Sequence, residues 1–127
     1  ADFQAISGKT SENVYVCVEY FDRESPNPST RKFVKNYEAR FGEPPDFFSA
    51  NYYDIVYVIA ELIKRVVAKG GNPLDGAQLE SAIWDAPKFD TVYGGKLELL
   101  RDGTARKALV IFKIIDGKLT LAERVSY

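Results

Sequence analysis

The apolar positions along the chain follow three successive patterns. Between 14 and 21, β-branched and aromatic residues run without alternation, which is typical of a strand buried inside a sheet. From 29 to 86 the apolar residues recur at helical spacing in three runs. From 91 to 127, short strand-like runs are separated by Asp-Gly turns. The sequence therefore predicts an α/β arrangement of one strand, three helices and a C-terminal β meander.

The first two predicted helices have clear boundaries. Ser29 is placed to cap the first helix, and Gly42 closes it. The pair Pro44-Pro45 then forces a break, because each proline fixes its own φ and disfavours helical geometry before it. The second helix, from about Ala50 to Lys69, is the longest. Its predicted apolar stripe consists of Tyr52, Ile55, Val56, Ile59, Leu62, Ile63 and Val66.

The third predicted helix begins with several start signals. Asp75 is the expected N-cap, and Gln78 is placed to reach back to it as in a capping box. Leu74 and Leu79 have the spacing of a hydrophobic staple. The helix is expected to end near Asp85.

Three amphipathic helices need a larger sheet than these strands supply. Methionine is absent even at the first position, which indicates that the numbered chain begins after a cut. We therefore expect a piece of a larger protein. The apolar helix faces are expected to be covered by the N-terminal part of the same protein or by a second copy, as a homo-oligomer or swapped dimer.

Composition excludes several functional classes. Seventeen basic residues stand against eighteen acidic ones, so nucleic acid is not an expected partner. Histidine is absent, which removes the usual general base and the commonest metal ligand. The single Cys17 is expected to be buried in its apolar strand. We predict no catalytic residue, no metal and no cofactor.

The junction 44–54 is the best candidate for chemistry. It places aromatic rings, small residues and an amide at a helix N-terminus, where backbone N–H groups and the helix dipole favour a carboxylate. A ligand mouth is one interpretation. The alternative is that the aromatic residues are core anchors and that Asn51 or Ser49 only caps the helix. Spacing alone favours this second interpretation.

Two pairs of acidic residues could in principle act as a catalytic acid and base. They are Asp85 with Asp90, and Glu98 with Asp102. Neither pair has a neighbour in the sequence that would shift a pKa, so a solvated surface is the favoured interpretation. A hydrolase is a remote hypothesis.

The order of segments resembles a known family. The segment from Asn27 to Asp46, the Tyr53-Asp54 pair, and the segments 90–97, 102–103 and 114–118 occur in the order seen in periplasmic substrate-binding proteins of branched-chain amino acid transporters. The resemblance is to the C-terminal part of these proteins. It spans nearly the whole chain.

This resemblance implies a partial type I periplasmic-binding-protein-like fold. Residues 1–127 would be the C-terminal fragment of a two-lobed receptor. Within it, 14–21 would be a crossover strand at the hinge, 29–86 would hold helices that pack on the first lobe, and 91–127 would hold the terminal strands.

The resemblance also implies a function. The receptor would be periplasmic or otherwise extracytoplasmic, and would close about its hinge on a small amino-acid-like or carboxylate ligand. It would deliver that ligand to the membrane permease of an ABC transporter. The ligand contacts would fall on Phe48, Ser49 and Asn51, with Tyr20 at the end of the crossover strand. The alternative is a ligand-sensing regulatory or interaction module of the same fold.

Overall fold

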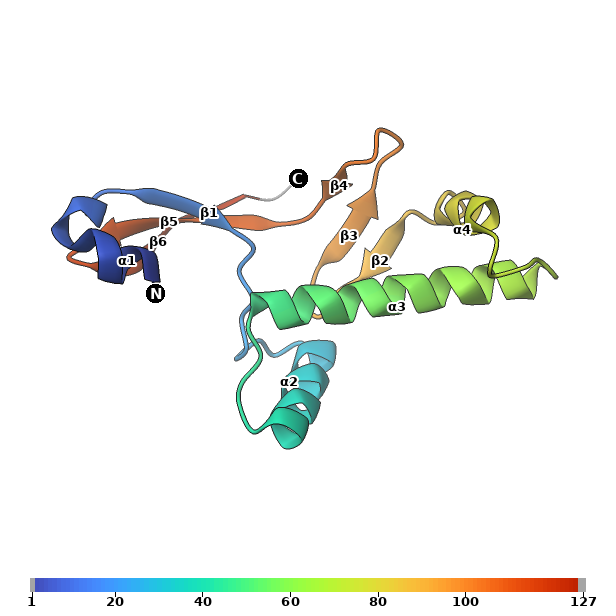
Figure 1. Cartoon of the computed structure of the whole chain (residues 1–127), viewed down its shortest axis with the longest axis horizontal. Coiled ribbons are helices and arrows are strands. Elements are labelled where there is room, and N and C mark those ends of the chain that lie inside the picture. Colours follow the sequence, from blue (N-terminus) through green and yellow to red (C-terminus); the bar gives the residue numbers. More distant parts are fainter. Residues whose placement is uncertain (1, 126–127) are drawn as a thin grey trace. The chain divides into compact units, whose positions relative to one another are not determined.

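A computed structural model describes residues 2–125. The chain divides into two compact units (Figure 1). Residues 2–20 and 108–125 form the first unit, and residues 21–107 form the second. The mixture of helices and antiparallel sheets confirms the predicted α/β class.

The first unit is a three-stranded antiparallel sheet preceded by short helices. The strand order is β1-β5-β6. Its elements are α1 (Asp2–Ser7), the 3-10 helix η1 (Gly8–Ser11), β1 (Tyr15–Val18), β5 (Leu109–Ile115) and β6 (Lys118–Val125).

The hairpin between β5 and β6 turns where the sequence predicts. Asp116 and Gly117 both have positive φ, 51° and 68°, as a tight two-residue hairpin requires. The carboxylate of Glu12 accepts hydrogen bonds from both turn amides, at 3.0 and 3.3 Å. The segment before β1 thus stabilises the turn at the other end of the chain.

The first strand differs from its prediction. β1 covers Tyr15–Val18 instead of 14–21, and within residues 2–125 it pairs only with β5, so it is an edge strand there. The expected burial of Cys17 is wrong, because this thiol is exposed. An apolar run in the sequence indicates a segment that tends to be buried, whereas its actual burial depends on which other segments pack against it. Tyr15 and Cys17, which point to the same face of β1, are both exposed.

The second unit holds the three predicted helices and a second antiparallel sheet, of order β2-β3-β4 (Figure 1). β2 was not predicted, because a three-residue strand is too short to show an alternating pattern. The elements are α2 (Pro28–Phe41), α3 (Phe47–Ala68), α4 (Gly76–Ile83), β2 (Lys88–Asp90), β3 (Lys96–Leu99) and β4 (Ala105–Arg106).

The start of α2 corrects one prediction. Asn27, not Ser29, is the N-cap, and its side-chain oxygen accepts from the amides of Ser29 and Thr30 at 2.8 and 3.2 Å. The reason is Pro28, which suits the first helical position and so moves the cap one residue before it. Gly42 closes the helix as predicted, with a φ of 74°.

The start of α4 is confirmed in part. Asp75 is the N-cap and accepts from the Ala77 amide at 2.9 Å. Gln78 reaches back, but its amide group donates to the Asp75 side chain at 3.0 Å instead of accepting from the Asp75 backbone. The predicted staple is wrong, because the side chain of Leu74 is 91% exposed.

Two small cores pack against the long helix α3, one at its N-terminal part and one at its C-terminal part. One contains Phe21, Phe33, Ala50 and Val92, and the other contains Leu62, Val66, Ala82 and Phe89. Of the predicted stripe on α3, only Leu62 and Val66 belong to a core, the second one. The remaining stripe residues, which are exposed in this unit, are Tyr52, Ile55, Val56, Ile59 and Ile63.

Candidate functional site

The first turn of α3 carries three of the four predicted ligand contacts. The helix begins at Phe47, three residues before the predicted start, because Asp46 directly after Pro45 acts as the N-cap. One carboxylate oxygen of Asp46 accepts from the backbone amide of Ser49 at 2.8 Å and from its hydroxyl at 2.7 Å. Both cap candidates from the sequence, Ser49 and Asn51, are therefore wrong.

The electrostatics of this turn are set by the protein's own carboxylate. The hydrogen bonds from the Ser49 amide and hydroxyl lower the pKa of Asp46 below its usual value of 3.8. An ionised carboxylate thus occupies the positive end of the helix dipole. This arrangement removes the reason for expecting a ligand carboxylate at the same backbone amides.

The aromatic residues of the junction fall into two groups. Tyr53 packs on the buried Phe33, with ring centroids 4.5 Å apart. Burial raises the pKa of Tyr53 to about 12, in keeping with its place in the core. Phe48 is 58% exposed and lies against Phe47, with ring centroids 4.0 Å apart. The interpretation as core anchors holds for Tyr53 and fails for Phe48 and for Tyr52, which is 70% exposed. Of these two exposed rings, Phe48 is the one that the family resemblance names as a ligand contact.

Ser49 and Asn51 are both engaged by neighbouring side chains. The Ser49 hydroxyl, besides its bond to the cap, lies 3.1 Å from the hydroxyl of Tyr37. The side-chain oxygen of Asn51 accepts from Nζ of Lys107 at 2.6 Å. That ammonium group also lies 3.5 Å from the ring centroid of Tyr93, which is a close cation–π contact.

Tyr20, the fourth predicted contact, belongs to the first unit. Its ring meets that of Phe112 edge to face, with centroids 5.7 Å apart. The guanidinium of Arg124 lies 5.6 Å from the Tyr20 ring centroid. The tyrosine side chain is 41% exposed at the point where the chain leaves this unit. Its role as a ligand contact stays a prediction.

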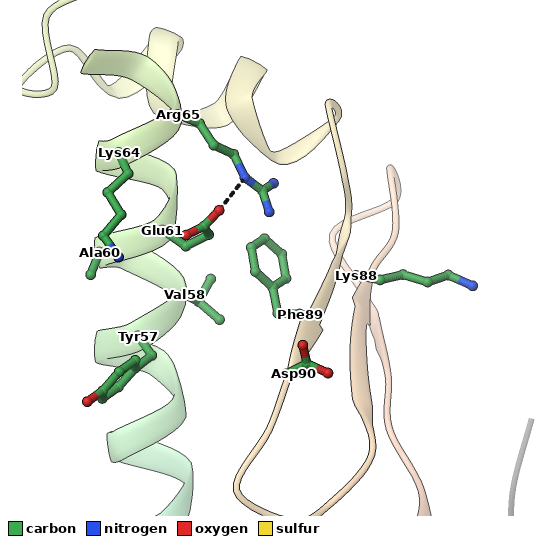
Figure 2. A pocket seen from close by; sticks show the side chains of 9 residues that line it. All are labelled: Tyr57, Val58, Ala60, Glu61, Lys64, Arg65, Lys88, Phe89 and Asp90. Carbon is green, nitrogen blue, oxygen red and sulfur yellow. Dashed lines mark hydrogen bonds and ion pairs between the residues drawn. The ribbon is translucent and has the colours of Figure 1, made fainter. Parts of the chain in front are cut away.

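A groove of about 410 Å³ lies between α3 and β2 and was not predicted (Figure 2). Phe89 points toward α3 beside Val58, and the guanidinium of Arg65 lies 4.9 Å from the centroid of the Phe89 ring. Arg65 is already bound, to the Glu61 carboxylate at 3.2 Å and to the carbonyl oxygens of Ala82 and Ala86 at 3.2 and 2.8 Å. The arginine therefore holds α3, α4 and the start of β2 together.

Asp85 and Asp90, one of the two acidic pairs considered for hydrolysis, each form an ion pair with a surface lysine. Asp85 binds Lys69 at 2.5 Å, and Asp90 binds Lys96 at 2.5 Å. The Asp90 side chain is 86% exposed, so these contacts contribute little to stability. Across residues 2–125, no group of three acidic or cysteine side chains is arranged to hold a metal ion. No helix in the same range is long and apolar enough to cross a membrane.

The structure brings Phe48, Ser49 and Asn51 together because they share one helical turn. Sequence reasoning missed Asp46, although an aspartate after proline and before an apolar helix is a recognisable cap signal. It also missed Lys107 and Tyr93. Lys107 is 56 residues from Asn51 in the sequence, and no local pattern could reveal that pairing.

The Asp46 cap should make the stability of the protein depend on pH in the acid range. Replacing Asp46 with Ala should destabilise the protein by about 1 kcal/mol at neutral pH, because the Ser49 amide loses its acceptor. The folded-state pKa of Asp46 is lowered, so its contribution is present above the usual value of 3.8 and lost as pH falls through the lowered value. Urea unfolding midpoints at about pH 7 and about pH 2 measure this.

Asp46→Asn is the matched control for that prediction. Asparagine keeps an acceptor for the Ser49 amide but does not titrate, so its unfolding midpoint should lack the acid-dependent part of the wild-type loss. An unchanged acid dependence in Asp46→Asn would contradict the assignment.

Comparison with protein-family models identifies one match. The periplasmic binding protein family matches residues 1–118. The comparison with curated proteins gives no match.

Several solved structures share the fold. A leucine-binding protein from Thermotoga maritima is 22% identical with a TM-score of 0.71, over 98% of this chain and 34% of that one. A benzoate-bound solute-binding protein from R. palustris is 22% identical with a TM-score of 0.64, over 98% of this chain and 34% of that one. A third structure is the substrate-binding protein of a branched-chain amino acid transporter from Streptococcus pneumoniae, bound to isoleucine. It is 22% identical with a TM-score of 0.66, with the same coverage of both chains. The chain spans about a third of these structures' length.

Proposed function

The chain belongs to the periplasmic binding protein family, and from this premise we propose that it is the C-terminal part of an extracytoplasmic solute-binding receptor. The receptor captures a small amino-acid-like or carboxylate ligand by hinge closure and delivers it to the permease of an ABC transporter. The N-terminal part of the same protein supplies the opposing wall of the site. The family is one of binding proteins, and no bond of the ligand is made or broken.

The exposed ring of Phe48 is the observation that carries this proposal. A large aromatic side chain that is 58% exposed at the start of a long, capped helix gains free energy when an apolar group covers it. The ligands named for the related structures include leucine, isoleucine and benzoate, and each has an apolar part beside a carboxylate. In our proposal Phe48 contacts the apolar part.

The acidic cap constrains where the ligand's charge is held. Because Asp46 already occupies the N-terminus of α3, a ligand carboxylate placed there would meet like charge. We therefore assign the carboxylate to groups outside the first turn of α3. In our proposal Asn51, whose side-chain oxygen accepts from Lys107, orients the ligand beside Phe48.

Calorimetry with leucine, isoleucine and benzoate tests the proposal on the full-length polypeptide that carries this chain. Phe48→Ala should weaken binding about tenfold or more, as expected when a buried aromatic contact is lost. Phe41→Ala is a matched control, because that phenylalanine is 57% exposed on α2 and should leave binding unchanged. Absence of binding to all three compounds would overturn the function. Equal affinity of Phe48→Ala and the wild type would overturn the site.

A further inference from the structure

The segment that precedes β5 is bound to the candidate site through one side chain. Lys107 follows β4 directly and is the last residue of the second unit. Its ammonium group donates to the side-chain oxygen of Asn51 at 2.6 Å and lies 3.5 Å from the ring centroid of Tyr93. A charged donor at this distance makes a stronger hydrogen bond than a neutral one.

Tyr93 completes the connection to the same helical turn. Its hydroxyl donates to the backbone carbonyl of Phe47 at 2.8 Å, next to Phe48 in the chain. Its ring meets the buried ring of Phe21 edge to face, with centroids 5.3 Å apart. Phe21 is the first residue of the second unit. One tyrosine thus contacts both ends of this unit's chain and the first residue of α3.

These contacts fix Asn51 in a defined way. A lysine ammonium can only donate, so the end of the Asn51 amide that faces Lys107 must be its oxygen. The amide is therefore held in one of its two flipped orientations. Tyr93 fixes the position of Lys107 in turn, because the ring attracts the cation and the hydroxyl ties that ring to the Phe47 carbonyl.

We propose that Lys107 and Tyr93 are positioning residues, which hold the Asn51 amide and the Phe48 turn in the orientation that binds ligand. This inference rests on the proposed function and extends it to two residues that no local sequence pattern indicates. A binding site held by such surrounding contacts has lower reorganisation costs than one carried by free side chains.

Lys107→Met is the first test, carried out on the full-length polypeptide with leucine as the probe. Methionine keeps much of the side-chain length but removes the charge and the donor. The Kd for leucine should rise about five- to twentyfold, and Lys107→Arg, which keeps a cationic donor, should stay within about threefold of the wild type. Lys113→Met is the matched control, because it removes a lysine that lies 5.4 Å from the ring of Tyr15 in the first unit. It should leave the Kd unchanged.

A double-mutant cycle separates positioning from simple structural support. If Lys107 acts through Asn51, the variant carrying both Lys107→Met and Asn51→Ala should bind leucine no more weakly than Asn51→Ala alone. Additive losses would overturn the inference. So would a fall in the unfolding midpoint of Lys107→Met without any change in its Kd.

The two proposals fail in different ways. If the wild type binds leucine and Phe48→Ala weakens that binding, while Lys107→Met and Tyr93→Phe both bind as the wild type does, the positioning role is wrong and the proposed function stands. If the wild type binds none of leucine, isoleucine and benzoate, the proposed function falls and the positioning role falls with it.

Discussion

Replacing Phe33 with Ala should destabilise the second unit by about 3–5 kcal/mol, the usual cost of removing a buried phenylalanine. Phe33 is 3% exposed and is the centre of an aromatic cluster formed by residues of α2, of α3 and of the segment before α2. Its ring centroid lies 5.7 Å from those of Phe21 and Tyr37 and 4.5 Å from that of Tyr53. Urea unfolding followed by circular dichroism measures the loss.

Phe41→Ala is the control for this change, because it removes the same side chain from the same helix. Phe41 is 57% exposed and its ring contact is with Tyr37, so Phe41→Ala should destabilise the unit by less than about 1 kcal/mol. Equal losses in the two variants would contradict the placement of the core.

Replacing Ile114 with Ala should destabilise the first unit by about 2–5 kcal/mol. Ile114 is 1% exposed and is among the most deeply buried side chains of the described chain. Its backbone also joins β5 to the segment before β1, since its amide donates to the Val14 carbonyl at 3.0 Å and its carbonyl accepts from Asn13 at 2.9 Å. Hydrogen exchange of amides in β1 and β5 should accelerate together in the variant.

The neighbouring residue provides the matched control. Ile115 has the same chemical structure and belongs to the same strand, but it is 41% exposed. Ile115→Ala therefore removes the same β-propensity without opening a cavity, and should cost less than about 1 kcal/mol. A larger loss for Ile115→Ala than for Ile114→Ala would show that the register of β5 is wrong.

Local signals in the sequence predicted most of the elements. The stop at Gly42, the cap at Asp75 and the turn at Asp116-Gly117 all appear where expected, because each depends on the conformational preference of one or two residues. The errors at the starts of α2 and α3 are also local. In both, a proline placed the true cap next to it.

Burial was harder to predict than secondary structure. Leu62 and Val66 are buried as the helical stripe on α3 implies, whereas Tyr52 and Val56 on the same stripe are 70% and 63% exposed. Cys17 is likewise exposed although it belongs to an apolar run. Apolar periodicity indicates which face of an element should be covered, but the covering residues come from other parts of the chain.

The sequence by itself determined the junction 44–54 as a rigid break followed by a long helix, with Phe48, Ser49 and Asn51 near the start of that helix. Only the tertiary structure decided what each of these side chains does. It assigned the cap to Asp46, left the Phe48 ring exposed and bound the Asn51 oxygen to Lys107. The physical reason is the separation along the sequence of the residues that interact. Helix starts and stops depend on neighbours in the sequence, whereas exposure and long-range hydrogen bonds depend on residues that folding brings together.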